Sequence, residues 1–311
     1  MTSTDYPPNA TILQRVHSLN GVVSYAHPLG TTYPKATIKE AVGNDFTTRE
    51  LPIDAALVGI DAMDVLVRLY RPHEITHWWR LLNCNLRIPA SAGTDAMPCT
   101  GKSMMGTSRV YVKSGAPLDY NQWIEAYRKG RSFVTTGPVV WLEVNGKEPG
   151  DVIEGEKDKL LKISIKAQAS CQFGLDHLEI ISMGQVIKKI DAKGQKSITL
   201  EHEMNIDANT WVVAQVFGSK PPVKHAAFSL HEQFACTSPV YCDLKKINSE
   251  FAGDAAYWVE WIDLFEQYLD QRNHYGGEKQ KAEVKTLLQQ ARDYYSDLLK
   301  KAKKTIPSPK T

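Results

Sequence analysis

Two residues with metal-binding side chains each follow an apolar stretch that has the composition of a buried strand. In residues 87–96, Arg-Ile-Pro-Ala-Ser-Ala-Gly-Thr-Asp-Ala, small and apolar side chains lead through Gly93 to the carboxylate of Asp95. In residues 21–28, Gly-Val-Val-Ser-Tyr-Ala-His-Pro, a second apolar run ends at His27, and the proline that follows blocks further sheet pairing. Imidazole and carboxylate groups are the usual ligands of Zn, Mn and Fe, and such ions convert bound water to hydroxide near neutral pH. If the two strands run parallel, both side chains lie at the carboxyl edge of one sheet, where α/β folds keep their chemistry.

Asp95 and two further histidines also have a purely structural explanation. Asp95 occupies a position that suits a helix N-cap or a turn former. His73 and His77 follow another expected strand and are one helical turn apart, so both can face the same way, but both can equally be helix-face histidines. The two tryptophans beside His77 favour the structural explanation for that residue. The candidate metal ligands are therefore His27, Asp95 and His73, and no catalytic residue is assigned. Three further carboxylates have suitable chemistry but no distinguishing pattern: Glu40, Asp61 and Asp64.

Two stretches that resemble catalytic loops each lack a required residue. Gly101-Lys102-Ser103 ends like a phosphate-binding loop, but the glycine required five residues before Gly101 is Ala96. Residues 89–93, Pro-Ala-Ser-Ala-Gly, resemble a nucleophile elbow, but a proline replaces the first glycine. The sequence therefore gives little support to either a P-loop or a serine hydrolase, and we interpret Ser91 as strand packing.

The elements that must position these residues change character twice along the chain. Up to residue 138, expected strands alternate with segments of helical spacing, which predicts a mostly parallel sheet with crossover helices. In residues 139–248, short alternating strands and the Asn145-Gly146 turn signal predict an antiparallel β-sandwich. In residues 249–304, two apolar stripes at helical spacing flank Gly276-Gly277 and predict a helical hairpin, followed by a tail at 305–311.

The composition of the chain limits the classes of binding partner and the compartment that we expect for it. The chain has 311 residues and a net charge of +2, so there is no electrostatic reason to expect nucleic acid or an anionic membrane. No apolar run reaches the length of a membrane span, and the first residues lack the basic and apolar regions of a signal peptide. The five cysteines have no CxxC spacing, which argues against a disulfide framework or a zinc ribbon. These features favour a reducing compartment, cytoplasmic by default.

Several motifs in the same order resemble the CehA/McbA metallohydrolases, the carbaryl-hydrolase-like branch of the PHP phosphoesterase superfamily. They are residues 21–28, 87–96, 109–112 (Arg-Val-Tyr-Val), 130–138 (Gly-Arg-Ser-Phe-Val-Thr-Thr-Gly-Pro) and 237–241 (Thr-Ser-Pro-Val-Tyr). The resemblance implies a distorted α/β barrel with a divalent metal site, followed by a β-rich domain. It also implies hydrolysis of a small ester, carbamate or phosphoester substrate by metal-activated water. In this comparison His27 matches the family's His-Pro ligand, Asp95 its late aspartate ligand, and His73 a histidine in the loop after the preceding strand.

The chain also departs from that family. It contains no His-x-His motif, with which PHP proteins open, and Met97 stands where the broader superfamily has a ligand histidine. Residues 1–138 supply about four strand–helix units, whereas a full (β/α) barrel needs roughly 250 residues. We therefore expect 1–138 to form the C-terminal half of a PHP-like barrel, in a truncated enzyme or in a chain completed by another copy or a partner. The alternative is a non-catalytic binding or assembly module.

Overall fold

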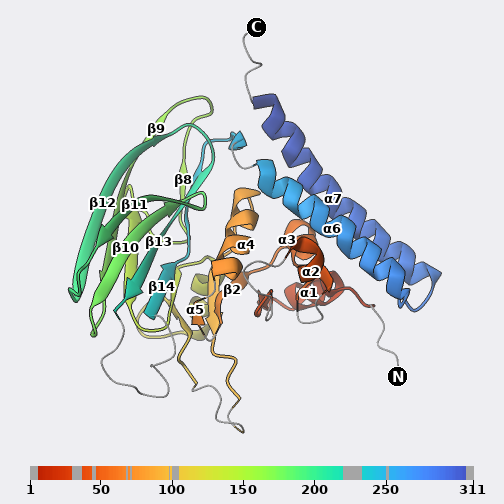
Figure 1. The fold of residues 1–311 in the computed structure, drawn as a ribbon, viewed down its shortest axis with the longest axis horizontal. Helices are drawn as coiled ribbons and strands as arrows, with labels where there is room; N and C mark the ends of the chain where they lie inside the picture. Colours follow the sequence, from red (N-terminus) through yellow and green to blue (C-terminus); the bar gives the residue numbers. More distant parts are fainter. Residues whose placement is uncertain are drawn as a thin grey trace.

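The computed structural model describes residues 6–29, 37–43, 47–67, 69–70, 72–97, 99, 105–219, 233–249 and 252–305. Its strands form three sheets. Two of them make a sandwich on one side of the molecule, and the two longest helices lie on the other side (Figure 1). The third sheet and the helix at Pro72–Asn83 lie between them. Within the described ranges, no helix is both long and apolar enough to cross a membrane.

The four-stranded sheet outside the sandwich contains the parallel strands that the sequence predicts. β1 and β4 both run parallel to β2, and Met63 of β2 is the register partner of both Tyr25 and Ala90. The two strands therefore lie on opposite sides of β2. β3 pairs antiparallel with the last two residues of β2, Leu66 and Val67. All six residues of β2 are buried, as is usual for the central strand of a parallel sheet. The elements of this part are α1 Asn9–Ser18, β1 Ser24–Tyr25, α2 Ile38–Gly43, α3 Leu51–Leu57, β2 Ala62–Val67, β3 Leu69–Tyr70, α4 Pro72–Asn83, β4 Ala90–Gly93 and α5 Tyr120–Arg128.

The predicted sandwich is present. Its larger sheet has eight strands: β11 Gln185–Asp191, β10 Leu175–Ser182, β13 Thr210–Gly218, β14 Gln233–Thr237, β6 Ser132–Thr135 and β5 Arg109–Val112 in this order, with β15 Val240–Asp243 beside β13 and β8 Val152–Glu154 beside β15. The smaller sheet is β12 Ser197–Ile206, β9 Leu161–Ser170 and β7 Val139–Val144. In β9 every second residue is buried, because one face of the strand packs on the larger sheet.

The prediction of half a PHP-type barrel is wrong. Residues 109–112 were expected to extend the α/β sheet, but as β5 they pair antiparallel with β6 and belong to the eight-stranded sheet. On the side of β4 away from β2, the backbone N–H of Ala90 donates to Ser238 Oγ at 3.0 Å instead of pairing with another strand. Ser238 Oγ also lies 2.9 Å from Ser132 Oγ of β6. A serine side chain thus ends the parallel sheet at β4 and joins it to the sandwich.

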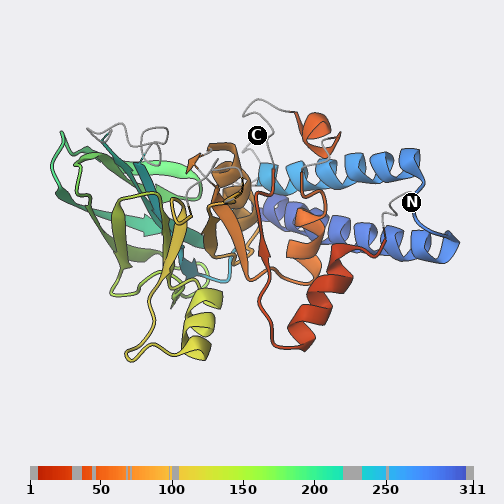
Figure 2. The same ribbon diagram turned by 90° about the horizontal axis from the view of Figure 1, so that it is seen from below.

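Two apolar cores hold these layers together. One fills the space between the two sheets of the sandwich. The other covers the opposite face of the eight-stranded sheet and extends through α4 and β2 to the long helices, an arrangement that Figure 2 shows from below. Trp78 and Trp211 are buried in this second core, with ring centroids 6.5 Å apart. The eight-stranded sheet is therefore a middle layer with apolar packing on both faces.

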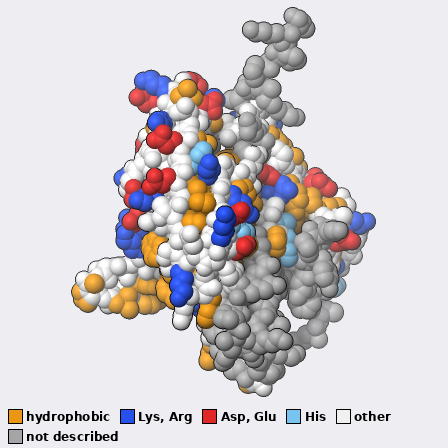
Figure 3. All heavy atoms as spheres, turned by 60° about the vertical axis from the view of Figure 1, so that its left-hand side comes forward, with side chains coloured by type: hydrophobic (Ala, Val, Ile, Leu, Met, Phe, Trp, Pro, Cys, Tyr) orange, Lys and Arg blue, Asp and Glu red, His pale blue; other side chains and the backbone are white. Residues whose placement is uncertain are grey.

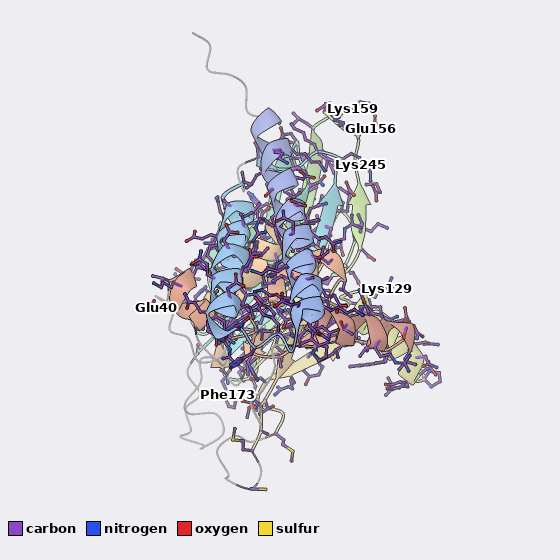
Figure 4. The ribbon with its side chains drawn as sticks, turned by 90° about the vertical axis from the view of Figure 1, so that its right-hand side faces the viewer. Glu40, Lys129, Glu156, Lys159, Phe173 and Lys245 are labelled. Carbon is purple, nitrogen blue, oxygen red and sulfur yellow. The ribbon has the colours of Figure 1, made fainter. Side chains whose placement is uncertain are left out.

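The long helices α6 (Ala252–Arg272) and α7 (Glu278–Thr305) lie side by side, as Figure 4 shows. Arg292 of α7 is paired with Asp263 of α6 at 2.7 Å and with Glu266 at 2.5 Å. The hairpin is attached to α3 by the Tyr295 hydroxyl, which donates to the carbonyl of Pro52 at 2.8 Å. Of the expected tail, Thr305 ends α7 and residues 306–311 lie outside the described residues.

Candidate functional site at the carboxyl edge of the parallel strands

His27 and Asp95 lie just beyond the carboxyl ends of two parallel strands. β1 ends at Tyr25 and β4 at Gly93, so each candidate follows its strand by two residues. Both side chains are exposed, and both backbones have a positive φ, 33° for His27 and 49° for Asp95. Asp and His adopt this conformation more readily than most non-glycine residues, and ten described non-glycine residues of the chain have it, so the positive φ marks a tight turn after each strand. Since β2 separates their strands, β1 and β4 are two interstrand spacings, roughly 10 Å, apart. The register also places Tyr25 level with Ala90, so β4 ends three residues further along the sheet than β1.

A buried carboxyl group on β2 lies between these two strands. Asp64 is 9% exposed, and the Ser24 hydroxyl of β1 donates to its Oδ1 at 3.5 Å. The backbone of Gly93 comes so close that a side-chain carbon there would lie 3.4 Å from Asp64 Oδ2. Burial raises the pKa of Asp64 to about 6, while hydrogen bonds from Ser91 and Ser24 and the nearby charge of His27 act in the opposite direction. Asp64 is therefore the residue of this edge that is both buried and electrostatically linked to His27.

Helix α5 covers the cluster through Tyr127. The hydroxyl of this buried residue donates to Ser91 Oγ at 2.8 Å. Burial raises the pKa of Tyr127, so the phenol stays protonated and remains a donor. Asp119 caps the start of α5 by accepting from the backbone N–H of Gln122 at 2.8 Å, which fixes where the helix begins. Two strands and one helix thus contribute hydroxyl groups around the carboxyl group of Asp64 on β2.

His73 and His77 have different surroundings, although both belong to α4. The ring of His77 is in contact with the carbonyl of His73 through Nδ1 at 2.7 Å and with the Tyr257 hydroxyl through Nε2 at 2.6 Å. Burial lowers the pKa of His77 to about 4, so it is a neutral packing residue between α4 and α6, and its structural explanation is correct. His73 lies in the first turn of α4, on the connection that follows β2 and β3.

The metal ligand set stays a prediction. In the part of the chain that the structure describes, no group of three or more His, Cys, Asp or Glu side chains is arranged to hold a metal ion. His27, Asp64 and Asp95 nevertheless have the donor chemistry that Zn, Mn and Fe prefer, and hydroxyl groups orient the middle carboxylate. The loop resembling a phosphate-binding loop, residues 101–103, lies outside the described residues.

Sequence reasoning missed the central part of this cluster. Ser91 was interpreted as strand packing, but it joins Tyr127 to Asp64. A carboxylate within the apolar run Ala-Met-Asp-Val-Leu-Val was the available signal for Asp64, because unpaired acidic residues are almost never fully buried. Tyr127 gave no such signal, since its helical spacing with Trp123 only indicated an apolar face.

Comparisons with known proteins do not assign the chain to a family. No family model matches the sequence, and no curated protein matches it. One solved structure with some likeness is the CARDB domain of a Pyrococcus furiosus protein, 16% identical over 35% of this chain and 97% of that domain, with a TM-score of 0.22. A TM-score of this size supports no conclusion about fold or function.

Proposed function

We propose that the chain contributes to a metal-dependent hydrolase site at the carboxyl edge of β1, β2 and β4. The observation that supports this most directly is the burial of Asp64 between two parallel strands that lead to His27 and Asp95. The resemblance to the CehA/McbA metallohydrolases agrees with the proposal and suggests an ester, carbamate or phosphoester substrate.

In this proposal His27 and Asp95 bind the ion from the two outer strands, and Asp64 supplies an oxygen from the middle strand. Metal binding would have to draw these side chains together, because no three donors are grouped around one point among the described residues. Ser24 and Ser91 keep the carboxylate of Asp64 in one orientation through their hydroxyl groups. When bound, a divalent ion would polarise the scissile group and supply hydroxide near neutral pH. Three protein ligands with an open position for water is the usual arrangement of a catalytic zinc site.

The test combines metal content with hydrolysis of p-nitrophenyl acetate and bis(p-nitrophenyl) phosphate. We expect the purified chain to bind one of Zn²⁺, Mn²⁺ or Fe²⁺, and His27→Ala, Asp95→Ala and Asp64→Asn each to lower metal affinity and turnover. His274→Ala and Asp293→Ala, which remove an exposed imidazole and an exposed carboxylate from the helical hairpin, are the matched controls. Metal binding and turnover that are unchanged in all three site variants would remove these residues from the mechanism.

A non-catalytic binding or assembly role is the second candidate. It is favoured by the lack of a three-donor group among the described side chains. The same metal-content and hydrolysis measurements separate the two functions. A binding module would bind none of the three ions at the carboxyl edge and would hydrolyse neither substrate.

A further inference from the structure

A large open groove lies on the sandwich, away from the carboxyl edge of the parallel strands. Its volume is about 1360 Å³, and its walls come from β5, β6, β7, β9 and the connection between β11 and β12. Small-molecule pockets usually have volumes of about 300–1000 Å³. The groove is therefore large enough for an extended ligand.

Aromatic rings are exposed in this groove. Trp141 on β7 is 52% exposed, while its neighbours Val140 and Leu142 point into the sandwich core. Tyr111 on β5 is 49% exposed, and its ring stacks on Phe133 of β6 with centroids 5.2 Å apart and planes 13° apart. Alternation along β7 holds Trp141 outward, and Tyr111 is the one exposed residue of β5. About half of each of these two large side chains therefore stays uncovered on folding. Ring faces left open in a groove are suited to stacking with a ligand.

The charges in and beside the groove are largely balanced by one another. Lys113 is paired with Glu148, and Lys166 lies 3.8 Å from Glu201. Figure 3, which brings the sandwich side of the molecule forward, shows basic and acidic side chains interspersed on that face without a field of one sign. A polyanion such as nucleic acid would need an excess of Lys and Arg. The groove is therefore matched to a ligand without net charge.

Uncharged hydrogen-bonding groups stand beside the exposed ring. Trp141, Gln168 and Thr199 form one row across β7, β9 and β12. Gln168 Nε2 donates to Thr199 Oγ1 at 3.4 Å, which leaves the amide oxygen and the second N–H bond of Gln168 for another partner. A ligand in this row would meet an apolar ring face next to amide and hydroxyl groups.

We propose that this groove binds a neutral, linear oligosaccharide. Sugar rings have apolar C–H faces that can stack on Trp141 and Tyr111, and hydroxyl edges that can exchange hydrogen bonds with Gln168 and Thr199. The volume of the groove accommodates several sugar rings, and its balanced charges suit an oligosaccharide that carries no charge. This site is separate from the proposed hydrolytic site, and neither proposal depends on the other.

The test is calorimetric titration of the full chain with four uncharged hexasaccharides: cellohexaose, xylohexaose, β-1,4-mannohexaose and maltohexaose. We expect at least one to bind with a Kd below about 1 mM. Trp141→Ala should weaken that binding about 5- to 150-fold, by analogy with the loss of one ring stacked on an aromatic side chain in nucleic-acid complexes. Phe173→Ala is the matched control, because Phe173 is a 40% exposed aromatic residue outside the groove (Figure 4) and should leave the affinity unchanged.

Circular dichroism and thermal melting of Trp141→Ala should match the wild type, since the ring is half exposed. Quenching of tryptophan fluorescence by the bound sugar gives a second measurement, and Trp141→Phe should keep part of the affinity. The proposal is overturned if none of the four sugars binds at millimolar concentration, or if Trp141→Ala binds them as the wild type does. It is equally overturned if an extended peptide or a sulfated glycan binds in a Trp141-dependent way and the neutral sugars do not.

Discussion

The hydroxyl of Tyr25 on β1 donates to Oδ2 of Asp54 on α3 inside the protein. Asp54 has no exposed surface, and no partner for its second oxygen, Oδ1, lies within the described residues. Burial raises the pKa of Asp54 to about 7, although the hydrogen bond from Tyr25 favours the charged form. A carboxyl group in these surroundings makes the stability of the fold depend on pH.

The first prediction concerns this carboxyl group. Since its pKa rises from about 3.9 in the unfolded chain to about 7 in the folded chain, the folded state retains a proton that the unfolded state releases. Its contribution to stability is therefore complete below pH 4 and is lost as the pH rises toward 7, by up to about 4 kcal/mol. Asp54→Asn should remove this loss, which urea denaturation at pH 5 and pH 8 measures. Asp293→Asn, which changes an exposed carboxylate, should behave as the wild type, and an equal loss in Asp54→Asn would contradict the assignment.

The second prediction concerns His77 and has the opposite sign. Burial lowers its pKa from about 6.5 to about 4, so the unfolded chain takes up a proton before the folded one does. The contribution of His77 is complete above pH 6.5 and is lost as the pH falls toward 4, by up to about 3 kcal/mol. His77→Gln should be less sensitive to acid than the wild type over this interval. His274→Ala is the control, and chemical denaturation from pH 7 to pH 4.5 would refute the prediction if all three proteins lost stability in parallel.

The sequence predicted those elements in which the local pattern of residue types indicates which side chains are buried. In β9, alternating polar and apolar residues indicated a half-buried strand, and two tryptophans beside His77 indicated packing. The pairing of β5 was not predictable in this way. A short strand such as Arg109–Val112 fits either a parallel or an antiparallel neighbour, and its partner β6 is separated from it by a helix. The pairing of β5 depends on contacts between distant parts of the chain, because its partner β6 also pairs with β14, about a hundred residues further along.

In the candidate site too, some residues could be assigned from the local sequence and others depend on long-range strand pairing. His27 and Asp95 could be assigned to strand ends because an apolar run precedes each of them. Asp64 acquires its significance from Ser24 and Ser91, which the register of β1 and β4 brings to it. No spacing within one segment encodes that register.

The third prediction tests how the parallel sheet ends. Ser238 has no exposed surface, and its Oγ accepts from the backbone N–H of Ala90 and contacts Ser132 Oγ. Ser238→Ala should leave both groups buried without this partner and should cost about 1–3 kcal/mol of unfolding free energy. Ser164→Ala, on the exposed face of β9, should change stability by less than about 0.5 kcal/mol. A loss in Ser238→Ala no larger than that of the control would show that the hydroxyl does not hold β4 against the sandwich.

The fourth prediction concerns the carboxyl group of the candidate site and needs no bound metal. Hydrogen bonds from Ser91 and Ser24 favour the charged form of Asp64, so Ser91→Ala should raise its pKa further above the present value of about 6. Tyr127→Phe should act in the same direction but less, because Tyr127 reaches Asp64 through Ser91. The ¹³C carboxyl shift of Asp64, followed by NMR during a pH titration of chelator-treated protein, measures the change. Thr199→Ala, a hydroxyl deletion on the sandwich, should leave the titration unaltered. If Ser91→Ala also leaves it unaltered, Asp64 and Ser91 do not share the hydrogen bond on which the proposed orientation of the carboxylate depends.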